Sequence, residues 1–248
     1  MLKHKRISQL LHCVIQRIAQ SFVKPTTIYR CMLVKKSVSL QRKHLPPSYL
    51  HCFTLLSPKA KLDQCNQSRL AEIYAALPHI PKQISNILSQ EEELERIASL
   101  IESCQQVIYL GRHNQYPIAL EGALKLKEIS YINANAYAAG ELKHGPLALV
   151  DTNTIIVYLV PNNHILEKNL SNMAEIQARG GKIICIAEQG VENHISEALA
   201  CFKTPKTHSD LSPIVQNIPL QLIAYFVAHQ KGNDVDQPRN LAKSVTVE

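Results

Sequence analysis

The sequence predicts an α/β protein, a three-layer sandwich with a parallel sheet, preceded by a basic N-terminal segment that we expect to be poorly ordered. From residue 69 onward, short apolar runs alternate with stretches of helical periodicity, about 25–30 residues from strand to strand. This alternation is typical of parallel strands joined by crossover helices. Before residue 69 no sustained period of either kind continues past Pro25, and no glycine occurs before Gly111.

Charge divides the chain at the same place. The 248 residues are 46% hydrophobic and 19% charged, which excludes a wholly disordered protein. Residues 1–68 contain 12 Lys and Arg but a single acidic residue, Asp63, whereas residues 69–248 contain 15 basic and 19 acidic residues. We therefore expect two parts: a basic segment, 1–68, and a folded part, 69–248.

The basic segment has three interpretations, of which we favour a poorly ordered extension. Apolar residues at helical spacing over residues 2–22 also fit a targeting peptide, and the charge fits an arm that binds nucleic acid or a membrane surface. Because no base-stacking aromatic pattern is present, we expect no nucleic-acid partner. The longest apolar run, 218–228, is too short to cross a membrane. The seven cysteines form no CxxC pair, which favours reduced thiols in a cytoplasmic protein.

The expected elements follow in order from the folded part. Apolar residues three or four apart predict helices, with Pro78 and Pro81 introducing a bend or break early in the series. Runs rich in β-branched and apolar residues predict strands. The predicted helices are 69–88 in short pieces, 91–101, 117–130, 165–179 and 214–231, and the predicted strands are 107–110, 154–160, 182–187 and 198–202.

A parallel sheet binds its ligands at the carboxyl ends of its strands, so the loops that follow the strands are the first candidates for a site. These loops are 111–116, 138–147, 161–164 and 188–195.

Three charged residues share one face of the helix predicted over 117–130. Glu121, Lys125 and Glu128 lie at positions i, i+4 and i+7 and span about 60° around the helix axis. Two carboxylates around an ammonium group suit a site that holds a sugar hydroxyl and moves a proton. The same spacing is also the commonest pattern of surface salt bridges, and spacing alone leaves both interpretations open.

The loop 138–146, A-A-G-E-L-K-H-G-P, combines two glycines and a proline with a charged triplet. These residues predict a tight backbone path around His144. An imidazole titrates near neutrality and can exchange a proton with a substrate oxygen. The alternative is a surface loop whose histidine is solvated.

The C-terminal segment 234–248 is specific enough that we expect it to be tied down. Arg239 and Lys243 lie four residues apart, on one side of a predicted helical turn. A lysine whose ammonium is desolvated or crowded by charge can form an imine with a carbonyl compound.

Three stretches together resemble the glutamine–fructose-6-phosphate aminotransferase (glucosamine-6-phosphate synthase) family. They are E-G-A-L-K-L-K-E-I-S-Y at 121–131, A-G-E-L-K-H-G-P-L-A-L-V-D at 139–151 and D-V-D-Q-P-R-N-L-A-K-S-V-T-V-E at 234–248. The resemblance covers roughly residues 69–248, which correspond to the second of two sugar isomerase domains. It implies that fructose 6-phosphate and ammonia from glutamine are converted to glucosamine 6-phosphate.

The resemblance also implies roles for individual residues. His144 would assist opening of the sugar ring, Lys243 would form the imine, and Glu128 would move the proton between C1 and C2. Glu121, Lys125 and Arg239 would organise the site and the tail that covers it. In this family the histidine serves a neighbouring subunit, which implies a homodimer; no cofactor and no metal ion are expected.

The sequence also departs from the family. Leu2 follows Met1 where the family's glutaminase domain needs an N-terminal cysteine, and no Ser/Thr-rich phosphate loop of the S-x-S-G-E-T kind occurs in the chain. His113 stands where relatives have a glycine, which leaves the conformation of that loop open, and Asn135 replaces a usual glutamate.

We therefore expect the C-terminal isomerase half of such an aminotransferase, truncated and inactive alone because nothing anchors the substrate phosphate. Whether it is an enzyme at all stays open at this point. The alternatives are a non-catalytic module that binds fructose 6-phosphate or glucosamine 6-phosphate, and complementation by a separate chain that supplies the missing domain.

Overall fold

A computed structural model describes residues 67–195 and 197–239 of the chain, which divides into two units, residues 1–88 and 89–248. The basic segment up to residue 66 and the predicted imine lysine, Lys243, lie outside the described residues. The boundary expected after residue 68 stays a prediction, because residues 67–88 group with the first unit.

The described part of the first unit is a series of short helices. They are α4 (Gln67–Ala76), the 3-10 turn η1 (Leu77–His79) and α5 (Ile80–Leu88). Pro78 and Pro81 lie in the first turns of η1 and α5, where the missing N–H group breaks no helical hydrogen bond. The predicted break at the prolines is therefore confirmed.

The second unit alternates helices with strands. Its helices are α6 (Glu91–Ile101), α7 (Tyr116–Ser130), α8 (Leu166–Gln177) and α9 (Ser212–Gln230). Its strands are β1 (Gln106–Gly111), β2 (Asn133–Ala138), β3 (Ile155–Val160), β4 (Lys182–Glu188) and β5 (Ala200–Thr204). Its 3-10 turns are η2 (His113–Gln115), η3 (Ala139–His144), η4 (Pro146–Leu149) and η5 (Glu192–His194).

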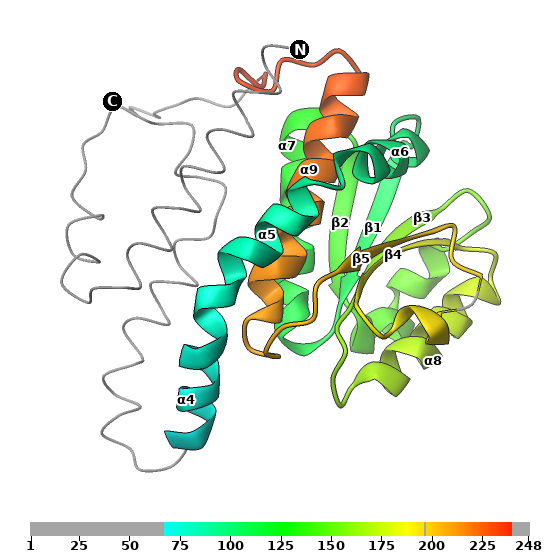
Figure 1. The fold of residues 1–248 in the computed structure, drawn as a ribbon. Helices are drawn as coiled ribbons and strands as arrows, with labels where there is room; N and C mark the ends of the chain where they lie inside the picture. Colours follow the sequence, from blue (N-terminus) through cyan, green and yellow to red (C-terminus); the bar gives the residue numbers. More distant parts are fainter. Residues whose placement is uncertain (1–66, 196, 240–248) are drawn as a thin grey trace, which may run out of the picture. The chain divides into compact units, whose positions relative to one another are not determined.

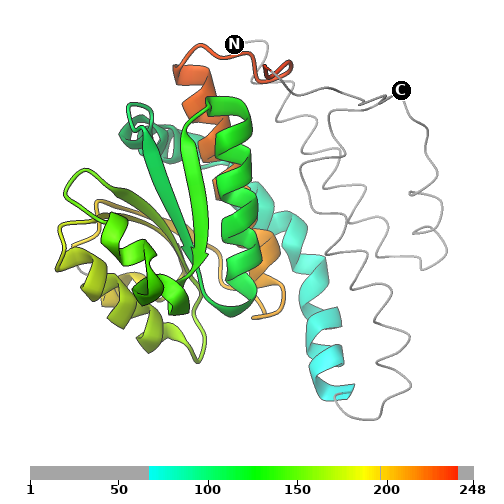
Figure 2. The same ribbon diagram turned by 180° about the vertical axis from the view of Figure 1, so that it is seen from behind.

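All five strands are parallel and lie in the order β2-β1-β3-β4-β5. Helices α6, α7 and α9 cover one face of the sheet, and α8 with η3 covers the other (Figures 1 and 2). The predicted three-layer α/β sandwich is confirmed. The direction in which strands are added to the sheet reverses at β1. Helix α7 connects β1 to β2 at the edge of the sheet, and the chain then crosses to β3 on the other side of β1.

The core lies on both faces of the sheet. Strand β3 is buried along its whole length, so alternate residues supply the two cores. On the α7 face, Gly122 permits close packing, because a Cβ atom there would come within 2.6 Å of Leu220 and 3.0 Å of the Tyr109 ring. The core on the α8 face is formed by Ile108, Leu110, Ala139, Leu142, Ile156, Tyr158, Val160, Met173, Ile176, Ile183, Cys185, Ala187 and Val191.

The sequence analysis missed one strand. Strand β2, N-A-N-A-Y-A, lies at an edge of the sheet and is mostly half-exposed, so it has no apolar run to identify it. The four predicted strands all occur, although β5 begins two residues later than expected. The segment predicted as a loop over 138–147 contains two consecutive 3-10 turns.

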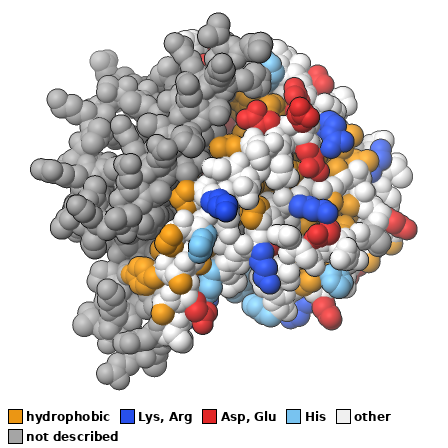
Figure 3. Space-filling view, viewed as in Figure 1, with side chains coloured by type: hydrophobic (Ala, Val, Ile, Leu, Met, Phe, Trp, Pro, Cys, Tyr) orange, Lys and Arg blue, Asp and Glu red, His pale blue; other side chains and the backbone are white. Residues whose placement is uncertain are grey.

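The described part of the chain contains neither a candidate membrane-spanning helix nor a candidate metal site. No helix there is long and apolar enough to cross a bilayer. Within residues 67–195 and 197–239, His, Cys, Asp and Glu side chains do not gather in groups of three that could hold a metal ion. On the face shown in Figure 3, basic and acidic side chains are interspersed.

The loop after β1 has an unusual backbone. His113 adopts a φ of 57°, in the left-handed region that L-residues disfavour. The neighbouring Gly111 is also needed, because a Cβ atom there would overlap the carbonyl group of Gln115. The glycine that we expected relatives to carry in place of His113 therefore has a physical reason.

A buried carboxylate joins three loops at the carboxyl edge of the sheet. Glu188, at the end of β4, is 3% exposed. One of its oxygens accepts the N–H of Asn162 at 2.9 Å, after β3, and the other accepts the N–H of Thr207 at 2.8 Å, after β5. Burial raises the pKa of Glu188, which outweighs the lowering by these two N–H groups and by the nearby Lys206.

The substitution His113→Gly should stabilise the protein. Glycine adopts a positive φ without the steric cost of roughly 1–2 kcal/mol that an L-residue meets in the left-handed region. Its greater loss of chain entropy offsets about 0.5–1 kcal/mol of that gain. We expect the free energy of unfolding, measured with urea and circular dichroism, to rise by about 0.5–1 kcal/mol. Gly111→Ala, the matched opposite change, should destabilise, and a destabilised His113→Gly protein would contradict the assignment of strain.

Glu188 should make stability fall as the pH rises. A raised pKa means that the folded protein binds more protons than the unfolded chain between the unfolded pKa of Glu188, near 4.5, and its higher folded value. Stability from this group is thus full below pH 4.5 and is lost above it, by less than about 1.4 kcal/mol per pH unit.

The substitution Glu188→Gln should flatten this part of the pH profile of unfolding. It should also cost about 1–3 kcal/mol throughout, because an amide can accept only one of the two N–H groups. The exposed Glu167→Gln is the control, and an unchanged pH profile in Glu188→Gln would refute this role of Glu188.

Candidate functional site

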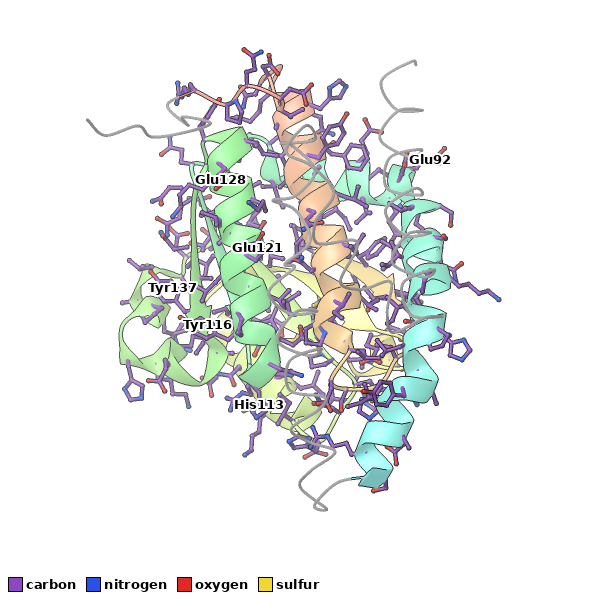
Figure 4. All side chains as sticks on the ribbon, turned by 90° about the vertical axis from the view of Figure 1, so that its left-hand side faces the viewer. Glu92, His113, Tyr116, Glu121, Glu128 and Tyr137 are labelled. Carbon is purple, nitrogen blue, oxygen red and sulfur yellow. The ribbon has the colours of Figure 1, made fainter. Side chains whose placement is uncertain are left out.

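The charged face predicted on α7 is formed in the structure. Lys125 is 6% exposed, and its Nζ lies 2.8 Å from Glu128 Oε2 and 3.7 Å from Glu121 Oε1. Figure 4 shows both glutamates along α7, with His113 beyond the opposite end of the helix. A lysine buried to this degree is not part of an ordinary surface salt bridge, because its ammonium group contacts two carboxylates and little water.

The segment after α9 returns to the carboxyl end of α7. Asn233 donates its side-chain N–H to the carbonyl of Ile129 at 3.0 Å. Farther along, the backbone N–H of Arg239 donates to the Tyr131 hydroxyl at 2.9 Å, and the guanidinium lies 4.1 Å from the centre of that ring. The structure thus brings Arg239 to the end of the helix that carries Glu128.

The turn that carries His144 belongs to the opposite layer. Ala139 and Leu142 of η3 are buried in the core on the α8 face. The His144 side chain is 74% exposed, and its Nε2 lies 4.0 Å from Glu141 Oε2, a residue that is itself 71% exposed. Within one chain the structure therefore does not bring His144 to Glu121, Lys125 and Glu128.

The backbone of η3 is held firmly although His144 is exposed. Arg112, directly after β1, donates to Asn172 Oδ1 at 2.9 Å, and Asn172 donates to the carbonyl of Ala139 at 2.8 Å. One turn farther along α8, Glu175 pairs with Lys143 at 2.8 Å. These contacts fix the start and the end of η3 on α8.

Gly145 completes the turn with a φ of 134°, a conformation in which an L-residue is strained. This agrees with the tight path predicted from the glycines.

The sequence analysis missed Tyr131, Arg112 and Asn172. Tyr131 is the last residue of the first family-like stretch, so its position was available, but nothing in its spacing marked it as a contact for the tail. Arg112 lies in a loop that the topology had singled out. Asn172 carries no sequence signal, because its role depends on the packing of α8 beside η3.

The described cysteines do not add a nucleophile to the site. Cys104, Cys185 and Cys201 form no disulfide, and burial raises the pKa of each thiol. Because the thiolate is the reactive form, these residues are poor nucleophiles at neutral pH.

Comparison with known proteins gives a consistent family. A family model described as the SIS domain matches residues 100–229. The chain is 50% identical over 186 residues to the glutamine–fructose-6-phosphate aminotransferase (isomerizing) of Zymomonas mobilis, over 75% of this chain and 31% of that protein. It is 48% identical over 194 residues to the protein of the same name from Escherichia coli K12, over 78% of this chain and 32% of that protein.

A solved structure extends the similarity to three dimensions. The C-terminal domain of glucosamine-fructose-6-phosphate aminotransferase from Francisella tularensis superposes with a TM-score of 0.70 and 44% identity, over 76% of this chain and 53% of that one. The chain spans about a third of the length of the curated relatives. It belongs to the SIS-domain family and is homologous to the C-terminal isomerase domain of glutamine–fructose-6-phosphate aminotransferases.

Proposed function

We propose that this chain provides the C-terminal isomerase half of a glutamine–fructose-6-phosphate aminotransferase, acting on fructose 6-phosphate to form glucosamine 6-phosphate. The observation that carries the proposal is the end of α7, where Glu128 is held at 2.8 Å by the buried Lys125 and where the tail bearing Arg239 is attached. The homologous relatives support the substrate, and the cytoplasmic location expected from the sequence belongs to the same proposal.

The proposed chemistry assigns one step to each group. The Lys243 amine attacks the C2 carbonyl of the open-chain sugar, and loss of water gives a protonated imine. Ammonia then adds to the C2 carbon of this imine and displaces the Lys243 amine, which leaves a protonated imine between ammonia and the sugar. That imine withdraws electrons and acidifies the C1–H bond, so the Glu128 carboxylate takes the C1 proton and returns it at C2, which forms the C1 aldehyde and the C2 amine of glucosamine 6-phosphate. Lys125 holds that carboxylate in one orientation through the whole sequence.

The reach of the tail supports the role of Lys243. Lys243 follows Arg239 by four residues, which span at most about 14 Å of chain. Because Arg239 is held by Tyr131, three residues beyond Glu128, the lysine can reach the same end of α7.

The separation of His144 from Glu128 supports a site shared between two copies. They belong to layers on opposite faces of the sheet, and the His144 imidazole is largely exposed. We therefore assign His144 to the site of a second copy of the chain, where it passes a proton to the ring oxygen during opening.

Turnover by the chain alone is not part of the proposal. The hydroxyl-rich loop expected to bind the sugar phosphate does not occur in the sequence. Phosphate binding that positions the reacting carbons must then come from residues outside this sequence, because that binding energy lowers the barrier.

The missing phosphate loop argues against turnover and leaves a second candidate, a module that binds sugar phosphate without turnover. Calorimetry with fructose 6-phosphate and glucosamine 6-phosphate separates the two. Micromolar binding by the chain alone, with no product when a phosphate-binding domain is added, would favour the second candidate.

One prediction of the proposed function concerns activity. The purified chain with fructose 6-phosphate and ammonium should form no glucosamine 6-phosphate, whereas product should form when the first sugar isomerase domain of a relative is added. In that mixture Glu128→Gln should lower kcat by about 10²–10⁴-fold, the usual contribution of a general base. Robust product from the chain alone would contradict the expected dependence on a partner.

Another prediction of the proposed function concerns the sharing of sites. Glu128→Gln and His144→Asn chains should each be inactive in the complemented mixture. Dissociated and reassembled at equal amounts, they should recover about a quarter of the wild-type activity, since half of the dimers are mixed and each mixed dimer has one intact site of two. No recovery, with mixed dimers demonstrated by mass spectrometry, would mean that both residues serve one chain's site.

A further inference from the structure

Tyr131 ends α7 in a conformation that tyrosine disfavours. Its φ is 62° and its ψ is 16°, in the left-handed region, and its N–H bonds the Lys127 carbonyl at 3.3 Å as the helix closes. Glycine is the common residue at such a helix end, because it has no Cβ atom to collide with the backbone. Because the protein keeps a large side chain there at a steric cost, we expect that side chain to have a role.

The side chain makes two contacts with one residue far along the chain. The Tyr131 hydroxyl accepts the backbone N–H of Arg239 at 2.9 Å, and the aromatic ring faces the Arg239 guanidinium at 4.1 Å. The hydrogen bond fixes the backbone of the tail, and the cation–π contact fixes the direction of the arginine. The two residues are 108 positions apart, so the contact depends on the fold and not on local sequence.

The segment between α9 and Arg239 is held at its start as well. Asn233 bonds the Ile129 carbonyl at 3.0 Å, two residues before Tyr131. Within the segment, Asp234 Oδ1 accepts the N–H groups of Asp236 and Gln237, at 2.9 and 3.2 Å. A short segment with an internal turn is therefore attached at its two ends to Ile129 and Tyr131.

We infer that Tyr131 is a positioning residue for the C-terminal tail: it holds Arg239 at the end of α7, three residues beyond Glu128. The attachment of the tail follows from the described contacts alone. Its consequence for the reaction rests on the proposed function, because it assumes that Lys243 forms the imine.

Limited proteolysis with trypsin tests the attachment without any assay of activity. The bond after Arg239 can be cut only when the tail leaves Tyr131, and mass spectrometry detects the fragment that ends at Arg239. We expect Tyr131→Phe, which loses only the hydroxyl acceptor, to be cut there about three- to tenfold faster than wild type. Tyr131→Leu, which also loses the ring, should be cut about 10–50-fold faster.

Tyr131→Gly separates positioning from stability. This variant removes the side chain but also relieves the strain of a positive φ at residue 131. Its free energy of unfolding in urea should therefore be at least that of Tyr131→Leu, whereas its tail should be cut by trypsin as fast as in Tyr131→Leu. Tyr137→Phe on β2, away from the tail, is the control for loss of a tyrosine hydroxyl and should be cut at the wild-type rate. Equal cutting of wild type and Tyr131→Leu would overturn the inference.

The effect on the reaction has a separate readout. In the complemented mixture, Tyr131→Leu should lower kcat about tenfold or more with a smaller change in KM, since the tail presents the amine but not the phosphate site, and Tyr131→Phe should restore most of kcat. Faster cutting with unchanged kcat would leave the attachment standing and would overturn the role of the tail in catalysis. If no mixture is active, the proposed function fails, while proteolysis still decides the attachment.

Discussion

The burial of β3 on both of its faces is the constraint on which the rest of the second unit depends. A strand with no exposed position needs apolar cover above and below, and the chain supplies α7 and α9 on one face and α8 with η3 on the other. That cover is what separates the groups of the candidate site into two layers. Glu128 belongs to one layer and His144 to the other, so the fold that stabilises the sheet also keeps these two side chains on opposite faces of the sheet within one chain.

Most of the architecture could be predicted from the sequence, because buried parallel strands are continuous apolar runs. Strands β1, β3 and β4 are such runs, and the Gly180-Gly181 pair marks the end of the helix between the last two. Strand β2 could not be found in this way, since its asparagines and alanines have weak strand preference and only its pairing with β1 makes it a strand.

The candidate site was less predictable than the fold. The spacing of Glu121, Lys125 and Glu128 identified one helix face but could not distinguish a surface salt bridge from a buried ion pair, because burial depends on neighbouring elements. The sequence left the conformation of the loop at His113 open, and only the structure shows the positive φ of this residue. The hydrogen bond from Arg112 to Asn172, which helps to hold η3, joins residues 60 positions apart. Neither periodicity nor a motif can reveal such a contact.

The backbone of Gly145 has a consequence for how this protein can diverge. At its φ of 134°, every other amino acid would have to force the turn into a new path. The exposed neighbours Glu141 and His144 have no comparable restriction from packing. If selection on the exposed side chains were relaxed, the histidine could be replaced freely while the glycine would be kept for its backbone conformation. A retained glycine in a distant homologue is therefore evidence of the turn and not of any chemistry.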